Sequence, residues 1–322
     1  GMMQPIRNSR IGPSARAIVV WGAGMLTVLT LVWLLASSCV LWWRTQSAVH
    51  RCHRALADKS GTVSDPNAVE KIRAEIRDLG GAIRAAERLG MYLRMPACMA
   101  PEKATALKML GECDNASLRA SHEVRDMLRE DDKDIRRLAA WTLGRARDIE
   151  SVPLLVRALD DGSWEVRTAA TEALVAIGEP TVDDLCAQLQ HAKWYEVRRS
   201  AAEALGDIRC LRCVPLLISA LKDEDNNVRM TAARSLGQMM DRRAVVPLVD
   251  ALNDENNDVC ASAAAALGMI GDKRAVGALR SASRHGHPLA REAACMALSR
   301  IEDSTPGRAN PRNPRDAARA RP

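Results

Sequence analysis

Phenylalanine is absent from this sequence of 322 residues, and aromatic side chains make up only 3% of it. Compact cores normally use some phenylalanine, so we expect thin layers filled by leucine, alanine, valine and isoleucine. Nine cysteines form no evident framework; most, such as Cys186, Cys260 and Cys295, fall at helical core positions and are interpreted as small buried thiols. The sequence also lacks a glycine-rich phosphate loop and a nucleophile elbow, which argues against the enzyme classes that use them.

The charges argue against a disordered chain and are unevenly spread. Hydrophobic residues make up 47% of the sequence and charged residues 27%, a balance typical of folded domains. The net charge of +6 divides into about +7 over residues 1–100, about −4 over 101–302 and about +3 over 303–322. Because the middle of the chain is mildly acidic, we expect no nucleic-acid partner.

Residues 17–43 form a run of 27 residues without one charge, between a basic tail over 1–16 and Arg44. As a helix it would measure about 40 Å, more than the roughly 30 Å hydrocarbon core of a bilayer. Trp21 and Trp42 lie near its two ends, where interfacial anchors are common. The pattern predicts a single transmembrane helix in contact with the lipid bilayer; a cleaved signal peptide would have a shorter apolar run.

The positive charges are nearly balanced around this run. Three arginines precede it, and three follow it within a dozen residues. The amino terminus adds a charge before the run, so the positive-inside rule slightly favours a cytoplasmic N-terminus. We therefore expect a single-pass protein of a bacterial inner membrane, with the bulk of the chain on the extracytoplasmic side.

Two segments connect the charge-free run to the rest of the chain. Residues 44–66 are expected to continue the helix and then loosen into a linker ending at Pro66, because proline favours a first helical turn. Residues 67–95 carry a narrow apolar stripe between charged positions, which predicts an amphipathic helix. Gly80 and Gly81 weaken a long coiled coil by about 1 kcal/mol each, so we favour packing on the following domain as a cap.

One phrase recurs every 31 residues between about 131 and 302. It is a hydrophobic residue followed in most copies by arginine, at Ile135-Arg136, Val166-Arg167, Val197-Arg198, Val228-Arg229, Val259-Cys260 and Ala290-Arg291. A leucine keeps the same interval, at Leu143, Leu174, Leu205, Leu236, Leu267 and Leu298. A fixed period of this size is the signature of a stacked repeat array.

Each repeat is predicted to be a pair of antiparallel helices. In the copy over 151–178, a Val-Pro-Leu segment opens the first helix, since proline favours a first turn and the leucines follow at helical spacing. An Asp-Asp-Gly turn at 160–162 interrupts it, and a second helix then runs over about 168–177. Gly178 ends that second helix.

The most complete copy contains Asn227-Val228-Arg229, Ala232-Ala233, Ser235-Leu236-Gly237, Asp241 and Val246-Pro247-Leu248. This pattern resembles HEAT repeats in their short, phycobilisome-lyase-like form, and the resemblance covers about 101–302 of a repeat domain placed at 96–302. It implies an all-α fold, a right-handed α-solenoid of about six helical pairs. The chain departs from the pattern at Cys260, which replaces the arginine, and at Val175 and Ser299, which replace a glycine.

Residues 96–130 are expected to form a degenerate first repeat, with one helix over 101–111 and a second over 117–129. Terminal repeats are commonly atypical because one face has no neighbour. Cys98 and Cys113 flank the first of these helices and are a candidate disulfide if the domain lies outside the cytoplasm. A helix of about ten residues would hold them more than 7 Å apart unless its ends fold back.

The recurring arginines form a ladder, at Arg136, Arg167, Arg198, Arg229 and Arg291. They lie near the starts of second helices, and the clearest copies follow acidic turns such as Asp160-Asp161. Ion pairs with those turns would hold neighbouring repeats together, although exposed pairs contribute only about 0–1 kcal/mol. We therefore interpret the ladder as structural.

No catalytic, metal or cofactor site is expected. Some HEAT-like proteins are iron hydroxylases that bind metal through several His-Glu dipeptides, whereas this chain has one, His122-Glu123. The lyase relatives implied by the resemblance handle bilin pigments, but shared repeats transfer a fold and not an activity. The chain is therefore expected not to be an enzyme.

Aromatic side chains gather in two turns between paired helices. Trp164 and Tyr195 lie one period apart and Trp194 adjoins Tyr195, whereas Asn226 and Asn257 stand at the equivalent positions of later repeats. One interpretation is that these rings pad the turns. The sharper hypothesis is a contact patch for a protein partner, since tryptophan and tyrosine are common interface anchors.

These patterns together predict a membrane-anchored HEAT-repeat scaffold that binds a protein partner without catalysis. The alternative is a membrane-held accessory or maturation factor, lyase-like, for a cofactor-bearing protein. Residues 303–322 are rich in proline, arginine and alanine and are expected to be a disordered basic tail.

Overall fold

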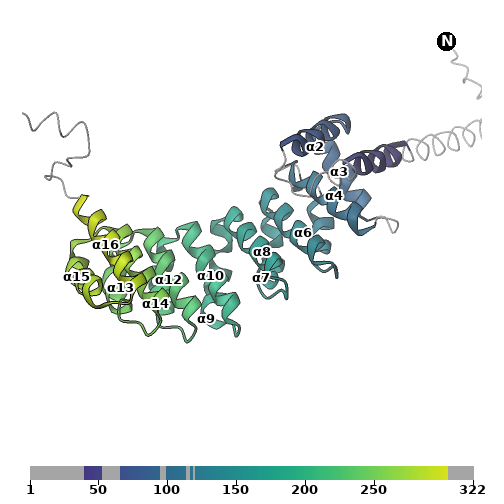
Figure 1. Ribbon diagram of the computed structural model, residues 1–322. Coiled ribbons are helices and arrows are strands. Elements are labelled where there is room, and N and C mark those ends of the chain that lie inside the picture. The colour runs from purple at the N-terminus through teal and green to yellow at the C-terminus, as the bar shows by residue number, and fades with distance from the viewer. Residues whose placement is uncertain (1–39, 53–65, 95–98, 114–116, 119, 304–322) are drawn as a thin grey trace, which may run out of the picture.

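The computed structural model describes residues 40–52, 66–94, 99–113, 117–118 and 120–303. Within these residues the secondary structure is helical, and no strand is present. The helices stack side by side into an elongated array, with α2 near one end and α16 at the other (Figure 1). Six helical pairs make up most of the array, as the 31-residue period predicts.

The first helices of the six pairs are short. They are α5 (Ser121–Met127), α7 (Val152–Ala158), α9 (Val182–His191), α11 (Val214–Ala220), α13 (Val245–Ala251) and α15 (Val276–His285). The second helices are longer and form a continuous row. They are α6 (Lys133–Ala146), α8 (Trp164–Ile177), α10 (Tyr195–Ile208), α12 (Asn226–Met239), α14 (Asn257–Ile270) and α16 (Pro288–Asp303).

The core of the array follows the leucine interval. Leu174, Leu205, Leu236 and Leu267 of the second helices are fully buried, and so are Leu155, Leu185, Leu217, Leu248 and Leu279 of the first helices. Alanines of successive second helices fill the space between layers, for example Ala202, Ala233 and Ala264. Small side chains let neighbouring helices approach closely, which explains how the chain folds without phenylalanine.

Most second helices end in a left-handed backbone residue. Arg147, Arg209 and Met240 have φ angles of 52°, 57° and 52°, and Gly271 has 71°. The amide of this residue donates a hydrogen bond back into the last turn, as the Met240 amide does to the Gly237 carbonyl at 3.1 Å. A short 3-10 turn then leads into the next first helix. The turn geometry therefore repeats with the same 31-residue period, although its residues differ.

Among the described residues, four helices precede the six pairs: α2, α3, α4 and a helix over 40–52. The sequence predicts one amphipathic helix over 67–95, but the chain forms α2 (Pro66–Asp78) and α3 (Ala82–Leu93). The break falls at Gly80 and Gly81, whose φ angles of 97° and 86° are left-handed. Such angles are favoured only for glycine, so these two residues separate the helices.

The next helix, α4 (Ala100–Gly111), belongs to the row of second helices. Gly111 lies directly against the Trp141 ring of α6, and α5 pairs with α6 in the first complete unit. The sequence instead predicts that residues 101–111 form the first helix of a degenerate repeat. Local periodicity identifies a helix but cannot say which row it joins.

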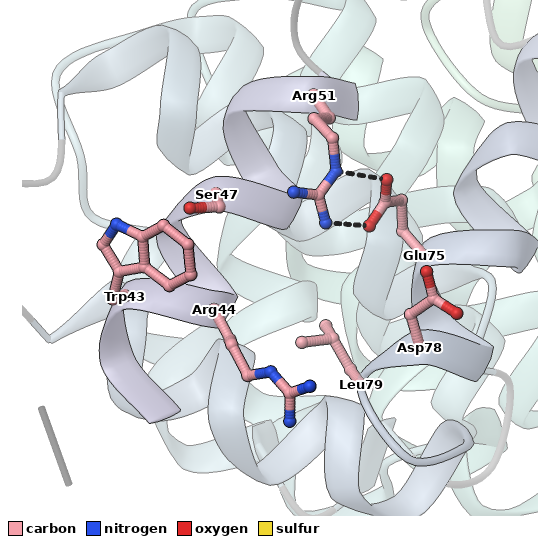
Figure 2. Close-up of a pocket in the computed structure, with 7 residues that line it drawn as sticks. All are labelled: Trp43, Arg44, Ser47, Arg51, Glu75, Asp78 and Leu79. Carbon is pink, nitrogen blue, oxygen red and sulfur yellow. Dashed lines mark hydrogen bonds and ion pairs between the residues drawn. The ribbon is translucent and has the colours of Figure 1, made fainter. Parts of the chain in front are cut away.

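Residues 40–52 form a helix that packs against this N-terminal part. Val49 and Cys52 are buried in the same core as Ile72 and Leu79. Arg51 donates two hydrogen bonds of 2.6 Å to the Glu75 carboxylate (Figure 2), and this contact raises the pKa of the Arg51 guanidinium.

The membrane localisation predicted from residues 17–43 is contradicted. Among the described residues, no helix is both long and apolar enough to cross a lipid bilayer. The four residues of the run that are described, 40–43, continue into the helix over 40–52, which carries Arg44 and Arg51 and packs on α2. Residues 17–39 lie outside the described residues. The predicted bilayer contact and extracytoplasmic repeat domain are not supported.

Candidate functional site at the α8–α10 junction

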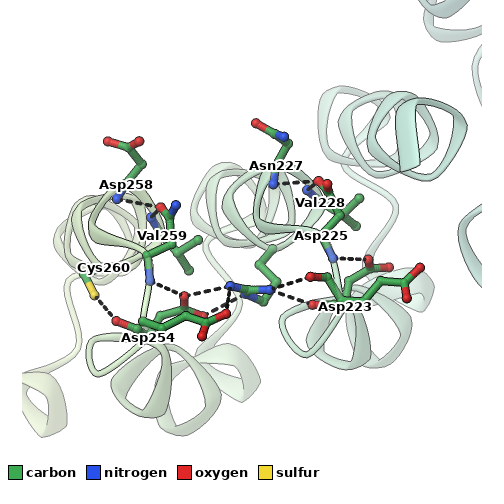
Figure 3. A network of polar contacts seen from close by, with 12 residues as sticks. Asp223, Asp225, Asn227, Val228, Asp254, Asp258, Val259 and Cys260 are labelled. Carbon is green, nitrogen blue, oxygen red and sulfur yellow. Dashed lines mark hydrogen bonds and ion pairs between the residues drawn. The ribbon is translucent and has the colours of Figure 1, made fainter. Parts of the chain in front are cut away.

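The ladder arginines bind the following repeat where the array is regular. Arg136, Arg198 and Arg229 each donate from Nε and Nη2 to one carboxylate, at distances of 2.8–3.0 Å. The acceptors are Asp161, Asp223 and Asp254, each 25 residues after its arginine. Figure 3 shows the Asp223 and Asp254 turns and their bonds. The pairs are largely removed from water, since Arg198 and Arg229 are buried.

These ion pairs raise the pKa of the arginines, and the pair with Arg136 also lowers the pKa of its acid, Asp161. The hydrogen bond to Asp254 raises the pKa of the Arg229 guanidinium, although burial opposes the shift. Burial also opposes ionisation of Asp161, but hydrogen bonds from Arg136 and from the Ser163 amide outweigh it and lower the pKa of that carboxyl. Arg136 and Asp161 are therefore both held in their charged forms, as a short bidentate pair requires.

The ladder is interrupted twice, in different ways. At Cys260 and His285 both partners are replaced, and the Cys260 thiol donates to the Asp254 carbonyl at 3.1 Å in place of the arginine. At Arg167 only the acid is missing, because Ala192 stands 25 residues later. Arg167 Nη1 donates to the Asp161 carbonyl at 2.8 Å, but its Nε is buried with no hydrogen-bond partner among the described residues.

The same junction lacks the glycine that sets the spacing of second helices. A Cβ added at Gly144, Gly237 or Gly268 would lie 2.6–2.8 Å from the alanine Cα of the next helix. Gly206 similarly faces Ser235, where the distance to Oγ would be 2.4 Å. Helix α8 carries Val175 at this position, so α8 and α10 are held apart. Their contact is less extensive than that between any other successive second helices of the described array.

A groove of about 440 Å³ opens between α8 and α10 as a result. Its walls are Thr168, Thr171, Glu172, Val175 and Ala176 on α8, and Arg199, Ser200, Glu203 and Asp207 on α10. The Glu203 carboxylate pairs with Arg234 at 2.8 Å, and Asp207 accepts a hydrogen bond from Gln238 at 3.2 Å. These two acids are therefore engaged with α12, whereas Glu172 is exposed.

The predicted aromatic patch lies at one end of this groove. Trp164, Trp194 and Tyr195 are 65%, 52% and 39% exposed. Trp164 lies four residues before Thr168, and Tyr195 lies four before Arg199, so each shares a helix face with a groove residue. Lys193 Nζ lies 4.9 Å from the centre of the Trp194 ring, within range of a cation–π contact.

Trp194 also stands where other repeats have a capping residue. In sister repeats the Asp225 and Asn256 side chains accept hydrogen bonds from the first amides of α12 and α14, whereas Trp194 makes no such bond to α10. A capping side chain typically contributes about 1 kcal/mol. The repeat thus has an exposed ring at a position where a capping side chain would stabilise the helix.

The remaining predicted residues lie elsewhere. Arg291 is exposed at the start of α16, and the position 25 residues after it lies outside the described residues. Cys98 is also outside them, while the buried Cys113 thiol lies 3.4 Å from the Met109 carbonyl, so the disulfide stays a prediction. Val175 departs visibly from the repeat pattern, but that departure alone does not predict the groove. Ala192 was missed, and only its 25-residue offset from Arg167 could have indicated it.

The fold and its repeated contacts define the class: an α-solenoid of stacked helical pairs held by inter-repeat ion pairs. The family model for HEAT repeats matches residues 100–174, 122–206, 182–267 and 245–309. These matches together cover more than half of the chain. The protein belongs to the HEAT-repeat family, and its repeats are of the phycobilisome-lyase-like kind.

Known proteins resemble parts of the chain. The phycocyanobilin lyase subunit alpha of Synechococcus elongatus is 36% identical over 94 residues, which are 26% of this chain and 34% of that protein. This chain thus spans about a third of the relative's length. The CpcE–CpcF complex of phycocyanin lyase from Nostoc sp. PCC7120 has a TM-score of 0.44 at 21% identity, covering 47% of this chain and 99% of that chain.

Importin beta is similar in fold. Its structure has a TM-score of 0.56 at 15% identity and covers 83% of this chain and 39% of that chain. At this identity the likeness concerns the fold alone. It places the described helices among α-solenoids.

Proposed function

We propose that this chain is a non-catalytic HEAT-repeat scaffold that binds a protein partner at the α8–α10 junction. The observation that carries the proposal is the buried Nε of Arg167, which has no hydrogen-bond partner among the described residues, close in sequence to Thr168 of the groove between α8 and α10. Elsewhere in the ladder, Arg136, Arg198 and Arg229 satisfy the same nitrogen within the chain. Repeat proteins bind partners along their extended surfaces, and a group that the stacking leaves without a partner is available there to another molecule.

The partner is expected to present a carboxylate to Arg167. A buried donor without a partner costs about 1–3 kcal/mol. At this junction the position of the aspartate is occupied by Ala192, whose side chain is small and cannot accept a hydrogen bond. An aspartate or glutamate from another protein would complete the two-bond contact that Asp161 makes with Arg136. The contact would be charge-assisted and planar, which gives it geometric specificity.

Trp164, Trp194 and Tyr195 supply the apolar part of the surface. Tryptophan and tyrosine bury a large area at a low cost in conformational entropy, and they are enriched among residues that dominate binding energy. Three exposed rings beside an unpaired guanidinium fit a segment that combines an acidic residue with apolar neighbours.

A photo-crosslinking amino acid tests the location of the surface. Placed at Glu172 in the groove, it should capture a defined protein in cells, whereas at Ala265 it should not. Ala265 is the exposed equivalent position on α14, three periods later in sequence. Equal capture at both positions would contradict a site at the α8–α10 junction.

Substitutions that imitate sister repeats separate binding from folding. Trp194→Asp supplies the cap that Asp225 provides elsewhere, and Trp164→Asn installs the residue found at Asn226. Both variants should keep or gain stability, and each should weaken the captured partner at least tenfold, which corresponds to about 1.4 kcal/mol. Retention of full affinity by the double variant would show that the rings do not contribute.

A lyase-like role is the second candidate, and the match to the phycocyanobilin lyase subunit favours it. Phycocyanobilin added to the purified chain would then form a stoichiometric complex with a shifted visible spectrum. If Ala192→Asp prevents the pigment from binding, the α8–α10 junction is a pigment site and not a protein-binding site. An unchanged spectrum would leave the scaffold as the favoured function.

A further inference from the structure

Three cysteines meet between α9 and α11: Cys210 and Cys213, which belong to one turn, and Cys186, which lies more than 20 residues earlier in the sequence. The Sγ atoms of Cys186 and Cys213 lie 3.3 Å apart, and those of Cys213 and Cys210 lie 3.1 Å apart. Cys213 is therefore in contact with both of the other thiols. Cys210 and Cys213 are buried, whereas Cys186 on α9 is half-buried and is the most accessible of the three.

Each of these cysteines replaces a different residue of the repeat. Cys186 occupies the position of Val156, Ile218 and Val249 in sister helices, and Cys213 that of Ser151, Ala244 and Ala275. Cys210 occupies the position of Asp148, Asp241 and Asp272. Three independent departures that converge on one contact argue against chance filling of a core.

The replacement at Cys210 also removes a stabilising contact. Asp241 and Asp272 each accept a hydrogen bond from a backbone amide of the following 3-10 turn, at 2.8 and 2.9 Å. The Cys210 side chain makes no such bond to the turn over Leu211–Cys213. The thiol therefore takes the place of a better cap, which indicates a use for the sulfur itself.

We propose that Cys186 and Cys213 form a reversible disulfide by exchange with a low-molecular-weight disulfide. The Cys186 thiolate attacks one sulfur of the small disulfide, forms a mixed disulfide and releases the first small thiol. Cys213 then gives up its proton and attacks Cys186 Sγ, which forms the Cys186–Cys213 bond and releases the second small thiol. Two protein thiols are oxidised, and the small disulfide is reduced to two thiols that carry the two protons.

The order of the two steps follows from exposure. Cys186 meets solvent, whereas Cys213 is 2% exposed and can react only after the mixed disulfide has formed beside it. Burial and the neighbouring thiols raise the pKa of Cys213, so it is a poor first nucleophile. Closing the bond requires the two sulfurs to approach to about 2.05 Å, a movement of little more than 1 Å from their 3.3 Å contact.

This bond would join α9 to the turn that begins α11. These are the first helices of two successive repeats, so the bond would connect one repeat to the next. The proposal concerns a modification site and does not depend on the proposed partner surface. Oxidation would cross-link the repeats beside the α8–α10 groove and leave the groove residues unmodified.

Peptide mapping of the purified full chain tests the proposal. The chain is incubated with oxidised glutathione, alkylated and digested with trypsin, which cuts after Arg209 and Arg212 and so separates all three cysteines. We expect the Cys186 and Cys213 peptides to be joined as the main internal product, and to separate after reduction. Cys295, which is exposed on α16, should carry a glutathione adduct and shows that the oxidant acted.

Two variants sharpen the test. Cys186→Ser should abolish the linked product, and Cys210→Asp should retain it while restoring the missing cap. A Cys295 adduct without a Cys186–Cys213 product would overturn the proposal, and so would a product that joins Cys210 to Cys213. Far-UV circular dichroism of each variant checks that the helices remain folded.

Discussion

The α12–α14 and α8–α10 junctions are built from the same repeat and differ in three respects. At the first, Gly237 lies against Ala266, Arg229 binds Asp254, and Asn256 caps α14. At the second, Val175, Ala192 and Trp194 stand in the corresponding places. Spacing, ion pair and cap are independent physical contacts, yet all three are absent from the same junction. The regular junction is closed by its own contacts, and the irregular one leaves groups available to another molecule.

The largest loss of stability should come from adding a side chain where α12 and α14 lie closest together. In Gly237→Val, the new Cβ would lie 2.8 Å from Ala266 Cα and 2.9 Å from its Cβ, so the two helices must separate. We expect a loss of about 3 kcal/mol, the upper range for overpacking, measured by urea denaturation. Ala265→Val on the exposed face of α14 is the control. An equal loss in both variants would show that the glycine contact does not set the spacing.

A smaller difference should separate two ladder arginines. Arg229→Met keeps the apolar stem but leaves the Asp254 carboxylate without its charged partner, which should cost about 2 kcal/mol. Arg167→Met loses the hydrogen bond from Nη1 to the Asp161 carbonyl but also removes a buried Nε that has no partner among the described residues. Because these two effects oppose each other, the change should be within about 0.5 kcal/mol. Denaturation of the two variants side by side measures the difference. Similar losses would indicate that Arg167 has a partner of equal strength within the chain.

Most of the array can be predicted from the sequence because two patterns agree. The spacing of apolar residues within each helix and the 31-residue interval between repeats indicate the same stacked helices. The 31-residue interval places the buried leucines and the ladder arginines on equivalent helices. Each helix pair buries its apolar face against neighbouring repeats of similar sequence, so the structure of one repeat predicts that of the next. The break at Gly80 and Gly81 and the row joined by α4 depend instead on packing between elements, which the pattern of one segment does not contain.

The site was less predictable for a similar reason. The aromatic residues stood out because sister repeats have asparagine at Asn226 and Asn257. The unpaired state of Arg167 depends on Ala192, and no rule of helical spacing connects residues 25 apart before the stack is known. Cys210 and Cys213 are neighbours in one turn, but only the stacking of repeats brings Cys213 to Cys186. The membrane helix predicted from the charge-free run over 17–43 is not supported, because no helix among the described residues is both long and apolar enough to cross a bilayer.

Supplying the missing acid should convert the irregular junction toward the regular one. In Ala192→Asp, the new carboxylate occupies the position from which Asp223 binds Arg198, and Arg167 gains a partner. We expect stability to rise by about 1 kcal/mol, the net value of a typical hydrogen bond, together with a loss of partner binding at the groove. Thermal unfolding and affinity are measured on the same preparation. Increased stability with unchanged binding would separate Arg167 from the proposed partner surface.

Acid should weaken the regular turns. Hydrogen bonds from the Arg274 side chain and amide lower the pKa of Asp272 to about 2, and those from Arg243 lower the pKa of Asp241. Their folded-state values lie below the ordinary value of about 3.9, so this stabilisation is complete above about pH 4 and is lost as the pH falls toward 2. Circular dichroism should show the unfolding temperature falling over this window by about 2–4 °C for each kcal/mol lost.

Asp272→Asn tests the assignment of this acid sensitivity. The variant lacks the ionisable group, so its unfolding temperature should fall less between pH 4 and 2 than that of the parent chain. The same decline in both proteins would mean that other carboxylates carry the effect.

The smallest effect should come from the left-handed turns that end α12 and α14. Met240 ends α12 with a left-handed φ of 52° and is 56% exposed, and Gly271 fills the same position after α14. Met240→Gly removes the strain of a left-handed backbone at a non-glycine residue, which should stabilise the fold by about 1–2 kcal/mol. Against this, glycine loses more backbone entropy on folding, at a cost of about 0.5–1 kcal/mol. We expect a net gain of about 0.5 kcal/mol by urea denaturation. The reverse change, Gly271→Met, should lose a similar amount; a loss in both directions would mean that the two turns are held by different contacts.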